Sequence, residues 1–292
     1  MSEEIPLKIT GHTELLGLIA YPIRHSSSPR VHNLALAKLG LEYAYLAFEV
    51  GQEDLKGAVE ALRTLKVRGS NVSMPNKLPI VQYLDKISPA VEITGAVNTV
   101  INDSGVLTGE TTDGIGQVAA LREQGQEVTG RIVTLMGCGG AGSAVAAQLA
   151  LEGVKELHIF NIADGFRAGA EKLVKKIRDK TSVTTTLTDL HDVDAFRATV
   201  AKSSILINAT KVGMADMKGQ SPLPDVSVLR KDLFVSDAIY SPLKTRLLEQ
   251  AEAAGCKYMN GIGMMLHQAA ASFKMWTGKD MPLDYVKEHL FQ

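Results

Sequence analysis

The sequence predicts a two-domain α/β protein, and two observations carry this prediction. Short apolar runs alternate with helix-like stretches along most of the 292 residues, a pattern typical of sheets covered by helices. A polar, glycine-rich break near residues 109–116 divides the alternation into two series, as expected of a hinge that borders a cleft between domains. We therefore expect one domain at residues 1–112, completed by helices within residues 262–292, and a second domain at residues 113–261.

The first series reads as a βαβα unit that ends in a hairpin. Its expected elements are, in chain order, a strand at residues 15–20, a helix at 29–39, a strand at 43–50, a helix at 55–65, a strand at 67–73, a helix after Pro75, and a hairpin that pairs 96–102 with 106–108. The hairpin turn falls on Asn102-Asp103-Ser104-Gly105, because these residue types favour tight turns.

The second series reads as five strands separated by helices. The expected strands lie at residues 132–136, 157–161, 183–187, 205–209 and 234–237. Two further helices, at residues 264–276 and 283–290, follow this series, and we expect them to pack back onto the first domain.

The composition points to an ordinary globular protein that acts on a small molecule. Hydrophobic residues make up 45% of the chain and charged residues 22%, and the formal net charge is −1. This balance carries no nucleic-acid or membrane footprint, so we expect neither partner. The N-terminus lacks the features of a signal peptide, and Cys138 and Cys256 form no metal-ligand spacing. We expect a cytoplasmic protein without a metal, and a homodimer is left open.

A glycine-rich loop follows the first strand of the second series. Gly137, Gly139 and Gly142 match the pattern G-x-G-x-x-G, and a helix is expected to begin directly after them. In such a loop the first glycine makes the turn, the second lets a pyrophosphate approach the backbone, and the third lets the helix pack on the strand. This context favours a Rossmann-type, doubly wound dinucleotide-binding domain over a purely structural glycine turn. Cys138 reads as a space-filling residue in preference to a reactive thiol.

Three other stretches carry residues suited to chemistry. They are R-H-S-S-S-P at 24–29, N-V-S-M-P-N-K at 71–77 and T-T-D-G-I-G at 111–116. Hydroxyls before a helix suit a carboxylate, and an ammonium at Lys77 beside a carboxylate at Asp113 could transfer a proton at an alcohol that loses hydride. The alternatives are that Ser28 only caps a helix, that Lys77 is a surface cation and that Asp113 braces a turn.

Taken together, these stretches resemble the shikimate/quinate dehydrogenase family along essentially the whole chain, and the dual-substrate type most closely. The matching motifs are H-S-x-S-P-x-x-H-N at residues 25–33, N-V-[ST]-x-P-x-K at 71–77, G-A-x-N-T at 95–99, N-A-T-x-x-G-M at 208–214, Y-x-P at 240–242 and the stretch G-I-G-M-M-L-H-Q at 261–268. Chance does not produce this set of motifs in the family's order.

The resemblance implies a reversible, NAD(P)-dependent oxidation of shikimate to 3-dehydroshikimate, a step of the chorismate pathway of aromatic amino acid biosynthesis, and in some members of quinate to 3-dehydroquinate. It implies that Lys77 and Asp113 form the catalytic pair. The implied substrate-binding residues are Ser26, Ser28, Ser73, Lys77, Asn98, Thr112, Asp113, Tyr240 and Gln268. The implied cofactor-binding residues are Gly137, Cys138, Gly139, Gly140, Ala141, Gly142, Asn161, Asp164, Thr210, Val212, Met214, Ala238 and Gly261. No metal is implied, and we expect loop or capping roles for His25 and His32.

Two stretches depart from the family pattern. Thr111 stands where the family commonly has asparagine in N-T-D, which bears on the hinge geometry and not on the reaction class. At residues 161–164 the chain reads Asn-Ile-Ala-Asp, where NADP-using members carry N-R-T. An apolar pair does not hold a phosphate dianion, whereas Asp164 would repel it and could accept hydrogen bonds from ribose hydroxyls. We therefore expect NAD in preference to NADP.

The substrate range is predicted from one side chain. Ser73 stands where many shikimate-specific relatives have threonine. Serine leaves room for about one more methyl group, and quinate has a puckered ring with an added hydroxyl. We therefore expect the protein to use both shikimate and quinate.

Two other functions compete with this interpretation. A dehydrogenase of a related cyclic polyol acid, such as an aminoshikimate, would keep the same motifs, so only substrate profiling separates it. A catalytically silent NAD-binding sensor would be expected to lack the lysine or the aspartate, yet Lys77 and Asp113 are both present.

Overall fold

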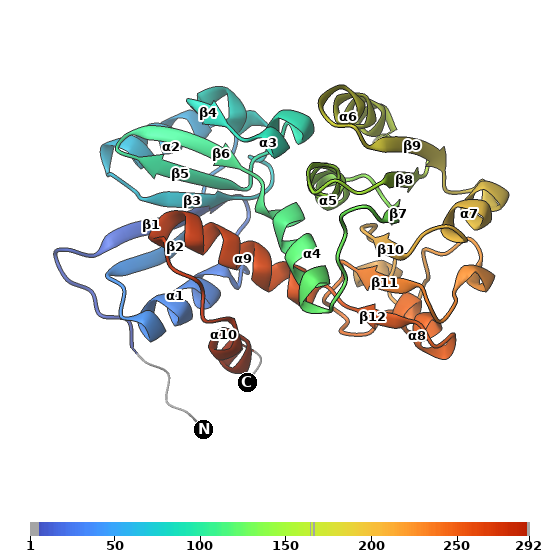
Figure 1. The fold of residues 1–292 in the computed structure, drawn as a ribbon. Coiled ribbons are helices and arrows are strands. Elements are labelled where there is room, and N and C mark those ends of the chain that lie inside the picture. Colours follow the sequence, from blue (N-terminus) through green and yellow to red (C-terminus); the bar gives the residue numbers. More distant parts are fainter. Residues whose placement is uncertain (1–5, 164, 166, 291–292) are drawn as a thin grey trace. The chain divides into compact units, whose positions relative to one another are not determined.

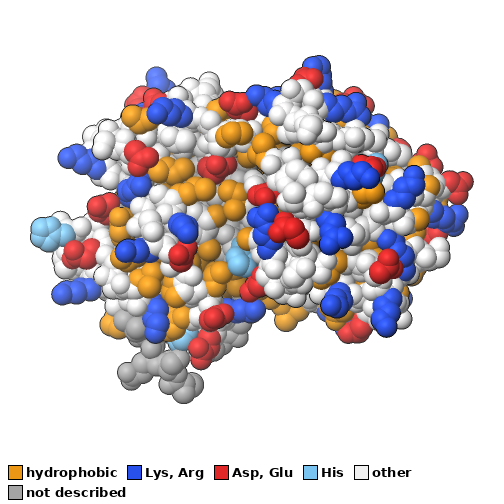
Figure 2. Space-filling view, viewed as in Figure 1, with side chains coloured by type: hydrophobic (Ala, Val, Ile, Leu, Met, Phe, Trp, Pro, Cys, Tyr) orange, Lys and Arg blue, Asp and Glu red, His pale blue; other side chains and the backbone are white. Residues whose placement is uncertain are grey.

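The computed structural model describes residues 6–163, 165 and 167–290, and the chain divides into two compact units. The first unit is formed by Met1–Thr112 with Leu266–Gln292, and the second by Asp113–Met265. Each unit is built around a six-stranded sheet (Figure 1). Acidic and basic side chains are intermixed over the face shown in Figure 2, in keeping with the net charge of −1. Within the described ranges no helix is long and apolar enough to cross a membrane.

The first unit has a mixed sheet with the strand order β2-β1-β3-β5-β6-β4. Its strands are β1 (Glu14–Ala20), β2 (Tyr43–Glu49), β3 (Gly69–Val72), β4 (Lys86–Ile87), β5 (Thr99–Asp103) and β6 (Val106–Glu110). Its helices before the second unit are α1 (Ser28–Leu39), α2 (Leu55–Thr64) and α3 (Pro89–Thr94). β1 pairs in parallel with β2 and β3, whereas β5 is antiparallel to β3 and β6. The predicted βαβα order is confirmed.

The hairpin is confirmed, but the helix expected after Pro75 is wrong. Ser104 and Gly105 both have positive φ, 54° and 95°, as a two-residue type I′ turn requires. After Pro75 only the short 3-10 helix η1 (Pro79–Tyr83) forms. An α-helix starting near Pro75 would need an N–H group at Pro79, and proline has none.

The C-terminal helices α9 (Ile262–Thr277) and α10 (Leu283–Leu290) pack on the first unit, as expected. The Trp276 indole N–H donates to the Val100 carbonyl at 2.9 Å. Gly69 makes room for this ring, because a Cβ atom there would lie 2.1 Å from Trp276 Nε1. The Arg30 guanidinium donates to the His289 carbonyl at 2.6 Å, which joins α10 to α1.

The second unit has an all-parallel sheet with the strand order β12-β11-β10-β7-β8-β9. Its strands are β7 (Ile132–Met136), β8 (Glu156–Asn161), β9 (Thr184–Asp189), β10 (Ile205–Asn208), β11 (Phe234–Asp237) and β12 (Lys257–Met259). Its helices are α4 (Thr112–Glu123), α5 (Gly140–Leu151), α6 (Arg167–Lys180), α7 (Val193–Val200) and α8 (Arg246–Ala253). In chain order from β7 this is the order 3-2-1-4-5-6 of the Rossmann fold, so the predicted fold class is confirmed.

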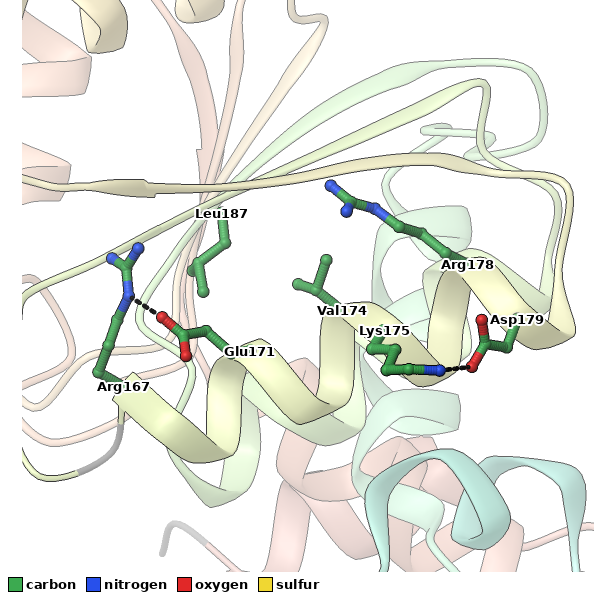
Figure 3. A pocket seen from close by; sticks show the side chains of 7 residues that line it. All are labelled: Arg167, Glu171, Val174, Lys175, Arg178, Asp179 and Leu187. Carbon is green, nitrogen blue, oxygen red and sulfur yellow. Dashed lines mark hydrogen bonds and ion pairs between the residues drawn. The ribbon is translucent and has the colours of Figure 1, made fainter.

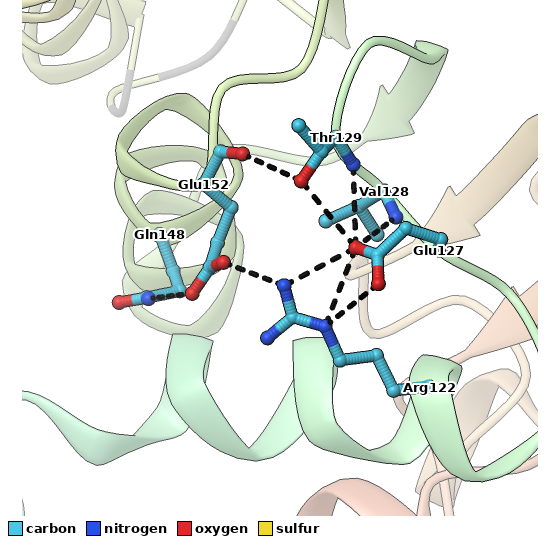
Figure 4. A network of polar contacts seen from close by, with 6 residues as sticks. All are labelled: Arg122, Glu127, Val128, Thr129, Gln148 and Glu152. Carbon is cyan, nitrogen blue, oxygen red and sulfur yellow. Dashed lines mark hydrogen bonds and ion pairs between the residues drawn. The ribbon is translucent and has the colours of Figure 1, made fainter.

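Two glycines of the expected hinge, Gly114 and Gly116, lie in a helix. α4 begins at Thr112, and Gly114 is buried in its first turn, where a Cβ atom would lie 2.3 Å from the Ala144 carbonyl oxygen of α5. Glycine is therefore needed for close helix packing here and does not mark a flexible loop. Near the other end of α4, Arg122 bonds both Glu127 and Glu152, at 3.2 and 2.7 Å, which ties α4 to the end of α5 (Figure 4).

Candidate functional site

The start of α1 presents two of the predicted substrate-binding serines. The Ser26 hydroxyl donates to the Ser28 hydroxyl at 3.2 Å and accepts from the Ser28 N–H at 3.2 Å. The alternative that Ser28 caps the helix is wrong, because Ser27 occupies the cap position and its side chain makes no capping bond. Two hydroxyls at the positive end of a helix dipole suit a carboxylate.

Tyr45, from β2, continues this row of polar groups into the interior. Its ring is fully buried, and its hydroxyl donates to Asn71 Oδ1 at 2.7 Å. Burial raises the pKa of Tyr45 well above its ordinary value, since the phenolate would lose its hydration. The phenol is therefore neutral and serves as a hydrogen-bond donor.

The Asn71 amide, on β3, lies at the centre of the network. Its Nδ2 donates to the Asn98 carbonyl and Thr99 Oγ1 at 3.1 Å each and to Ser272 Oγ at 3.2 Å. Ser272 comes from α9 and bonds Thr99 at 2.8 Å. The sequence did not single out Ser272, because nothing local shows that a residue 201 positions away from Asn71 will meet it.

Three predicted residues meet on the far side of this network. The Asn98 Oδ1 atom accepts from the Thr112 N–H at 2.8 Å and from the Thr112 hydroxyl at 3.2 Å. The Thr112 hydroxyl also lies 3.4 Å from Gln268 Oε1. Asn98 and Thr112 are buried, and Gln268 is partly buried. The structure therefore brings together Asn98, Thr112 and Gln268, as the family resemblance implies.

Lys77 and Ser73 are held by backbone contacts in the same unit. The Ser73 N–H donates to the Ile19 carbonyl at 3.1 Å, and the Lys77 carbonyl accepts from the Val97 N–H at 2.8 Å. The second contact fixes Lys77 beside the chain that leads into Asn98. Both side chains are partly buried, so Lys77 is not a fully exposed surface cation.

Asp113 and Tyr240 belong to the second unit. Asp113 is partly buried in the first turn of α4, where a carboxylate is favoured by the helix dipole. Tyr240 lies after β11, and 52% of it is exposed. The alternative that Asp113 only braces a turn does not match its conformation, since α4 already includes Asp113.

In the glycine loop between β7 and α5, two glycines are closely packed and two have open space beside them. Gly137 has φ of +90°, and a Cβ atom there would lie 2.8 Å from Thr210 Cγ2. A Cβ atom at Gly142 would lie 2.2 Å from the Gly137 carbonyl oxygen, whereas at Gly139 and Gly140 it would meet nothing within 4 Å. Two glycines are therefore required by packing, and the open backbone between them at the start of α5 suits a pyrophosphate.

Asn161, at the end of β8, braces this loop. Its Oδ1 accepts from the Cys138 N–H at 3.0 Å, and its Nδ2 donates to the Ile162 carbonyl at 2.8 Å. Cys138 is buried, and burial raises the pKa of its thiol, as expected of a space-filling residue. Asp164 lies outside the described residues. Further along, Arg167 begins α6 and pairs with Glu171 at 3.1 Å, beside a groove of about 310 Å³ (Figure 3).

A second polar cluster joins the ends of β10 and β11. Asn208 Oδ1 accepts from the Thr210 N–H and hydroxyl at 3.0 and 2.7 Å, and Asn208 Nδ2 donates to Asp237 Oδ1 at 3.0 Å. Asp237 Oδ2 accepts from the Thr245 hydroxyl at 2.6 Å. Burial raises the pKa of Asp237. Neither Asn208 nor Asp237 was assigned a role from the sequence. Asn208 ends β10, which pairs with the glycine loop's strand β7, and Asp237 ends β11, the next strand of the same parallel sheet, so their position at strand ends was an available signal.

The remaining predicted cofactor residues line the same strand ends. Val212 N–H donates to the Thr210 hydroxyl at 3.2 Å, and Met214 lies beyond it, 42% exposed. A Cβ atom at Gly261 would lie 2.1 Å from the Ala238 carbonyl oxygen, so only glycine fits against this backbone. In the described part of the chain, no group of three His, Cys, Asp or Glu side chains could hold a metal ion.

The strand order and the glycine loop define a two-unit α/β protein of the Rossmann type. The family model for the "Shikimate dehydrogenase substrate binding domain" matches residues 18–100, and that for the "Shikimate 5'-dehydrogenase C-terminal domain" matches residues 261–291. The chain is 55% identical over 291 residues to the shikimate dehydrogenase (NADP(+)) of Listeria monocytogenes serotype 4b, with 100% of both chains covered. The chain therefore belongs to the shikimate dehydrogenase family.

Two solved structures extend this comparison. Shikimate 5-dehydrogenase from Listeria monocytogenes, in complex with shikimate and NAD, superposes with a TM-score of 0.96 at 55% identity, covering 99% of this chain and 100% of that one. Quinate dehydrogenase from Corynebacterium glutamicum, in complex with NAD, superposes with a TM-score of 0.82 at 30% identity, covering 96% and 98%. The fold is thus shared with relatives named for shikimate and for quinate.

Proposed function

We propose that this protein catalyses the reversible, NAD(P)-dependent oxidation of shikimate to 3-dehydroshikimate, a step of aromatic amino acid biosynthesis. The observation that supports this most is the row of polar groups in the first unit, which includes the Ser26 and Ser28 hydroxyls and the Asn98, Thr112 and Gln268 groups. A carboxylate fits one end of such a row and ring hydroxyls fit the other. Membership of the shikimate dehydrogenase family points to the same substrate.

The residues divide into a substrate set and a cofactor set. Ser26 and Ser28 bind the substrate carboxylate, and the hydroxyls and carboxylate edge are bound by Ser73, Asn98, Thr112, Tyr240 and Gln268. Lys77 accepts or relays the alcohol proton, and Asp113 orients that proton. NAD(P), when bound by the glycine loop and by Asn161, Thr210, Val212, Met214, Ala238 and Gly261, supplies the hydride acceptor. Residues 1–112 with 262–292 bind substrate, and residues 113–261 bind the dinucleotide.

We further propose NAD as the preferred dinucleotide. Ile162 follows β8 as an apolar residue, 42% exposed, where a phosphate-binding cation would be needed. The nearby cation Arg167 is engaged by Glu171. The solved Listeria relative is in complex with NAD, whereas the Listeria sequence relative is named for NADP(+). The relatives therefore do not agree on the dinucleotide, and our proposal of NAD rests on the side chains of Ile162 and Arg167.

Quinate is the proposed second substrate. Ser73 supplies the hydroxyl that a threonine would, without the methyl group, and a relative named quinate dehydrogenase shares the fold. The runner-up function is oxidation of a related cyclic polyol acid such as an aminoshikimate. An enzyme with that function would have the same row of polar groups, so only rates measured with the candidate substrates distinguish the two functions.

The test is a matrix of initial rates with shikimate, quinate and an aminoshikimate, each with NAD and with NADP. We expect the highest kcat/KM with shikimate and NAD, and measurable oxidation of quinate. Absence of shikimate oxidation with either dinucleotide would overturn the proposal. A higher kcat/KM with the aminoshikimate would favour the runner-up, and dinucleotide binding without turnover of any substrate would favour a sensor.

A further inference from the structure

We infer that Asp237 is a positioning residue of the dinucleotide site, whose carboxylate holds the loop after β10 and the loop after β11 in a fixed relative position. The loop after β10 contains the predicted cofactor residues Thr210, Val212 and Met214, and the loop after β11 contains Ala238. In this role Asp237 acts on the dinucleotide through the two loops, without touching it. The inference deepens the proposed function and rests on its dinucleotide site.

One carboxylate oxygen joins the two loops. Asp237 Oδ1 accepts from the Asn208 side-chain amide at 3.0 Å and from the Ile239 N–H at 3.1 Å. Asn208 ends β10, and Ile239 lies in the loop after β11. A shift of one loop relative to the other would therefore stretch or bend one of these two bonds. The other oxygen, Oδ2, accepts at 2.6 Å from the hydroxyl of Thr245, which caps α8.

The hydrogen bonds continue from Asn208 to the glycine loop. Asn208 Oδ1 accepts from the N–H and the hydroxyl of Thr210 at 3.0 and 2.7 Å, and the Thr210 hydroxyl accepts from the Val212 N–H at 3.2 Å. A Cβ atom at Gly137 would lie 2.8 Å from Thr210 Cγ2 and 2.9 Å from the Thr210 nitrogen. Thr210 thus packs against the first glycine of the loop that is proposed to bind the pyrophosphate. A movement of Asn208 would therefore change this contact.

The burial of Asp237 argues against a space-filling role. Its side chain is 0% exposed, and the groups of the described residues that bond its carboxylate are all neutral. Burial raises the pKa of Asp237, and the three hydrogen bonds offset this shift in part. A buried charge without a cation costs free energy, which an apolar side chain of similar size would not. The three accepted bonds therefore account for the carboxylate at this position.

Two substitutions of Asp237 separate the hydrogen bonds from the charge. Asp237→Ala leaves Asn208 and Ile239 without their shared acceptor, and we expect the Kd of NADH, measured by fluorescence titration, to rise about 10-fold. Asp237→Asn keeps Oδ1 as an acceptor, and the Thr245 hydroxyl can turn to accept from an amide. The Kd of NADH should then stay within about 3-fold of wild type, whereas a role of the negative charge would not be rescued. A parallel series with NADPH uses the same variants.

Thr134→Val is the matched control for lost stability. Thr134 is buried in the same sheet, and its hydroxyl bonds Ser203 Oγ at 2.7 Å. Ser203 precedes β10, whereas the loop held by Asp237 follows it, so this pair lies at the other end of the strand. We expect Thr134→Val to lower the melting temperature and to leave the Kd of NADH within about 2-fold of wild type.

Asn208→Ala breaks the link between the loops from its other side. We expect it to raise the Kd of NADH by about as much as Asp237→Ala, roughly 10-fold. In the Asn208→Ala background, Asp237→Ala should raise the Kd by less than about 3-fold more, because the link is already broken. A combined effect equal to the product of the two single effects would overturn the inference.

The remaining outcomes separate the inference from the proposed function. An Asp237→Ala protein that binds NADH as tightly as wild type, or as tightly as the Thr134→Val control, overturns the inference. If wild type binds NADH but does not oxidise shikimate, the proposed reaction fails, and the Kd values still decide the role of Asp237. If wild type binds neither NADH nor NADPH, the dinucleotide site fails and the inference with it. Should Asp237→Ala not fold, Asp237→Ser, whose shorter side chain does not reach Asn208, replaces it and should show the same rise.

Discussion

The imidazole of His32 lies parallel to the phenol ring of Tyr45, with ring centroids 4.4 Å apart and planes within 9°. Phe273 and Trp276 complete the aromatic surroundings, at 6.3 and 5.3 Å from the imidazole. Full burial among these rings lowers the pKa of His32 from 6.5 to about 3. His32 is thus a neutral core residue, and the loop or capping role expected for it is wrong.

This burial predicts a pH-dependent stability. The unfolded chain takes up a proton at His32 below about pH 6.5, whereas the folded chain does so only near pH 3. The stabilisation is therefore complete above about pH 6.5 and is lost as the pH falls toward 3, by up to about 1.4 kcal/mol per pH unit. Urea unfolding measured across this range should show the slope.

The variant His32→Phe should remove that slope while keeping an aromatic ring on Tyr45. His32 Nδ1 has no hydrogen-bond partner, so the substitution leaves no donor or acceptor unpaired on that side. The surface variant His12→Ala should keep the slope. An unchanged slope in His32→Phe would mean that other groups carry the acid sensitivity.

Gly114 and Gly57 should respond in opposite ways to alanine. A Cβ atom at Gly114 would lie 2.3 Å from the Ala144 carbonyl oxygen, whereas at Gly57, inside α2, it would meet nothing within 4 Å. We expect Gly114→Ala to lower the free energy of unfolding by roughly 1 to 3 kcal/mol and Gly57→Ala to raise it by up to about 1 kcal/mol. Denaturant titrations of both variants test this, and equal shifts would contradict the close packing of α4 on α5.

These glycines show where sequence reasoning succeeded and where it failed. The loop glycines at 137–142 were interpreted correctly as a turn, because a strand before and a helix after them set a known geometry. Gly114 and Gly116 were interpreted as a hinge, since composition alone does not distinguish a flexible glycine from one that permits close packing. The missing information was the position of α5, which only the fold supplies.

The residues of the candidate site also fall into those that the sequence predicts and those that it does not. Motif positions such as Ser26, Asn98 and Thr112 could be predicted because the family pattern names them one by one. The contacts of Tyr45 and Ser272 could not be predicted from the sequence, because they join strands and helices distant in sequence. Buried polar relays of this kind are set by tertiary structure and leave no local spacing to detect.

The dinucleotide preference should respond to charge at the end of β8. In Ile162→Arg combined with Asp164→Ser, a guanidinium replaces an apolar side chain, and a carboxylate that repels phosphate is removed. We expect the ratio of kcat/KM with NADP to that with NAD to rise by roughly 10-fold to 100-fold, as a charge-assisted contact to phosphate allows. Ile9→Arg, an exposed position in the first unit, should leave the ratio unchanged. A wild-type preference for NADP would show that the interpretation of Ile162 is wrong.

The substrate range should respond to one methyl group at residue 73. Ser73→Thr keeps the hydroxyl and fills the space that the puckered quinate ring is expected to need. We expect kcat/KM for quinate to fall roughly 10-fold more than that for shikimate, within the 1 to 3 kcal/mol that a methyl-sized change supplies. Ser182→Thr, at an exposed position, is the control. Equal losses on the two acids, or no quinate oxidation by wild type, would place the selectivity elsewhere.

Shikimate-dependent reduction of NAD by wild type and by Lys77→Ala tests the central claim most directly. Steady-state rates should show that Lys77→Ala lowers kcat by roughly 100-fold or more while KM changes less, because a proton-transfer group has been lost and not a binding contact. Lys56→Ala, an exposed lysine on α2, should retain wild-type rates, and equal melting temperatures would show that all three proteins are folded. Wild-type turnover of shikimate that survives nearly unchanged in Lys77→Ala would contradict the account and remove Lys77 from the mechanism.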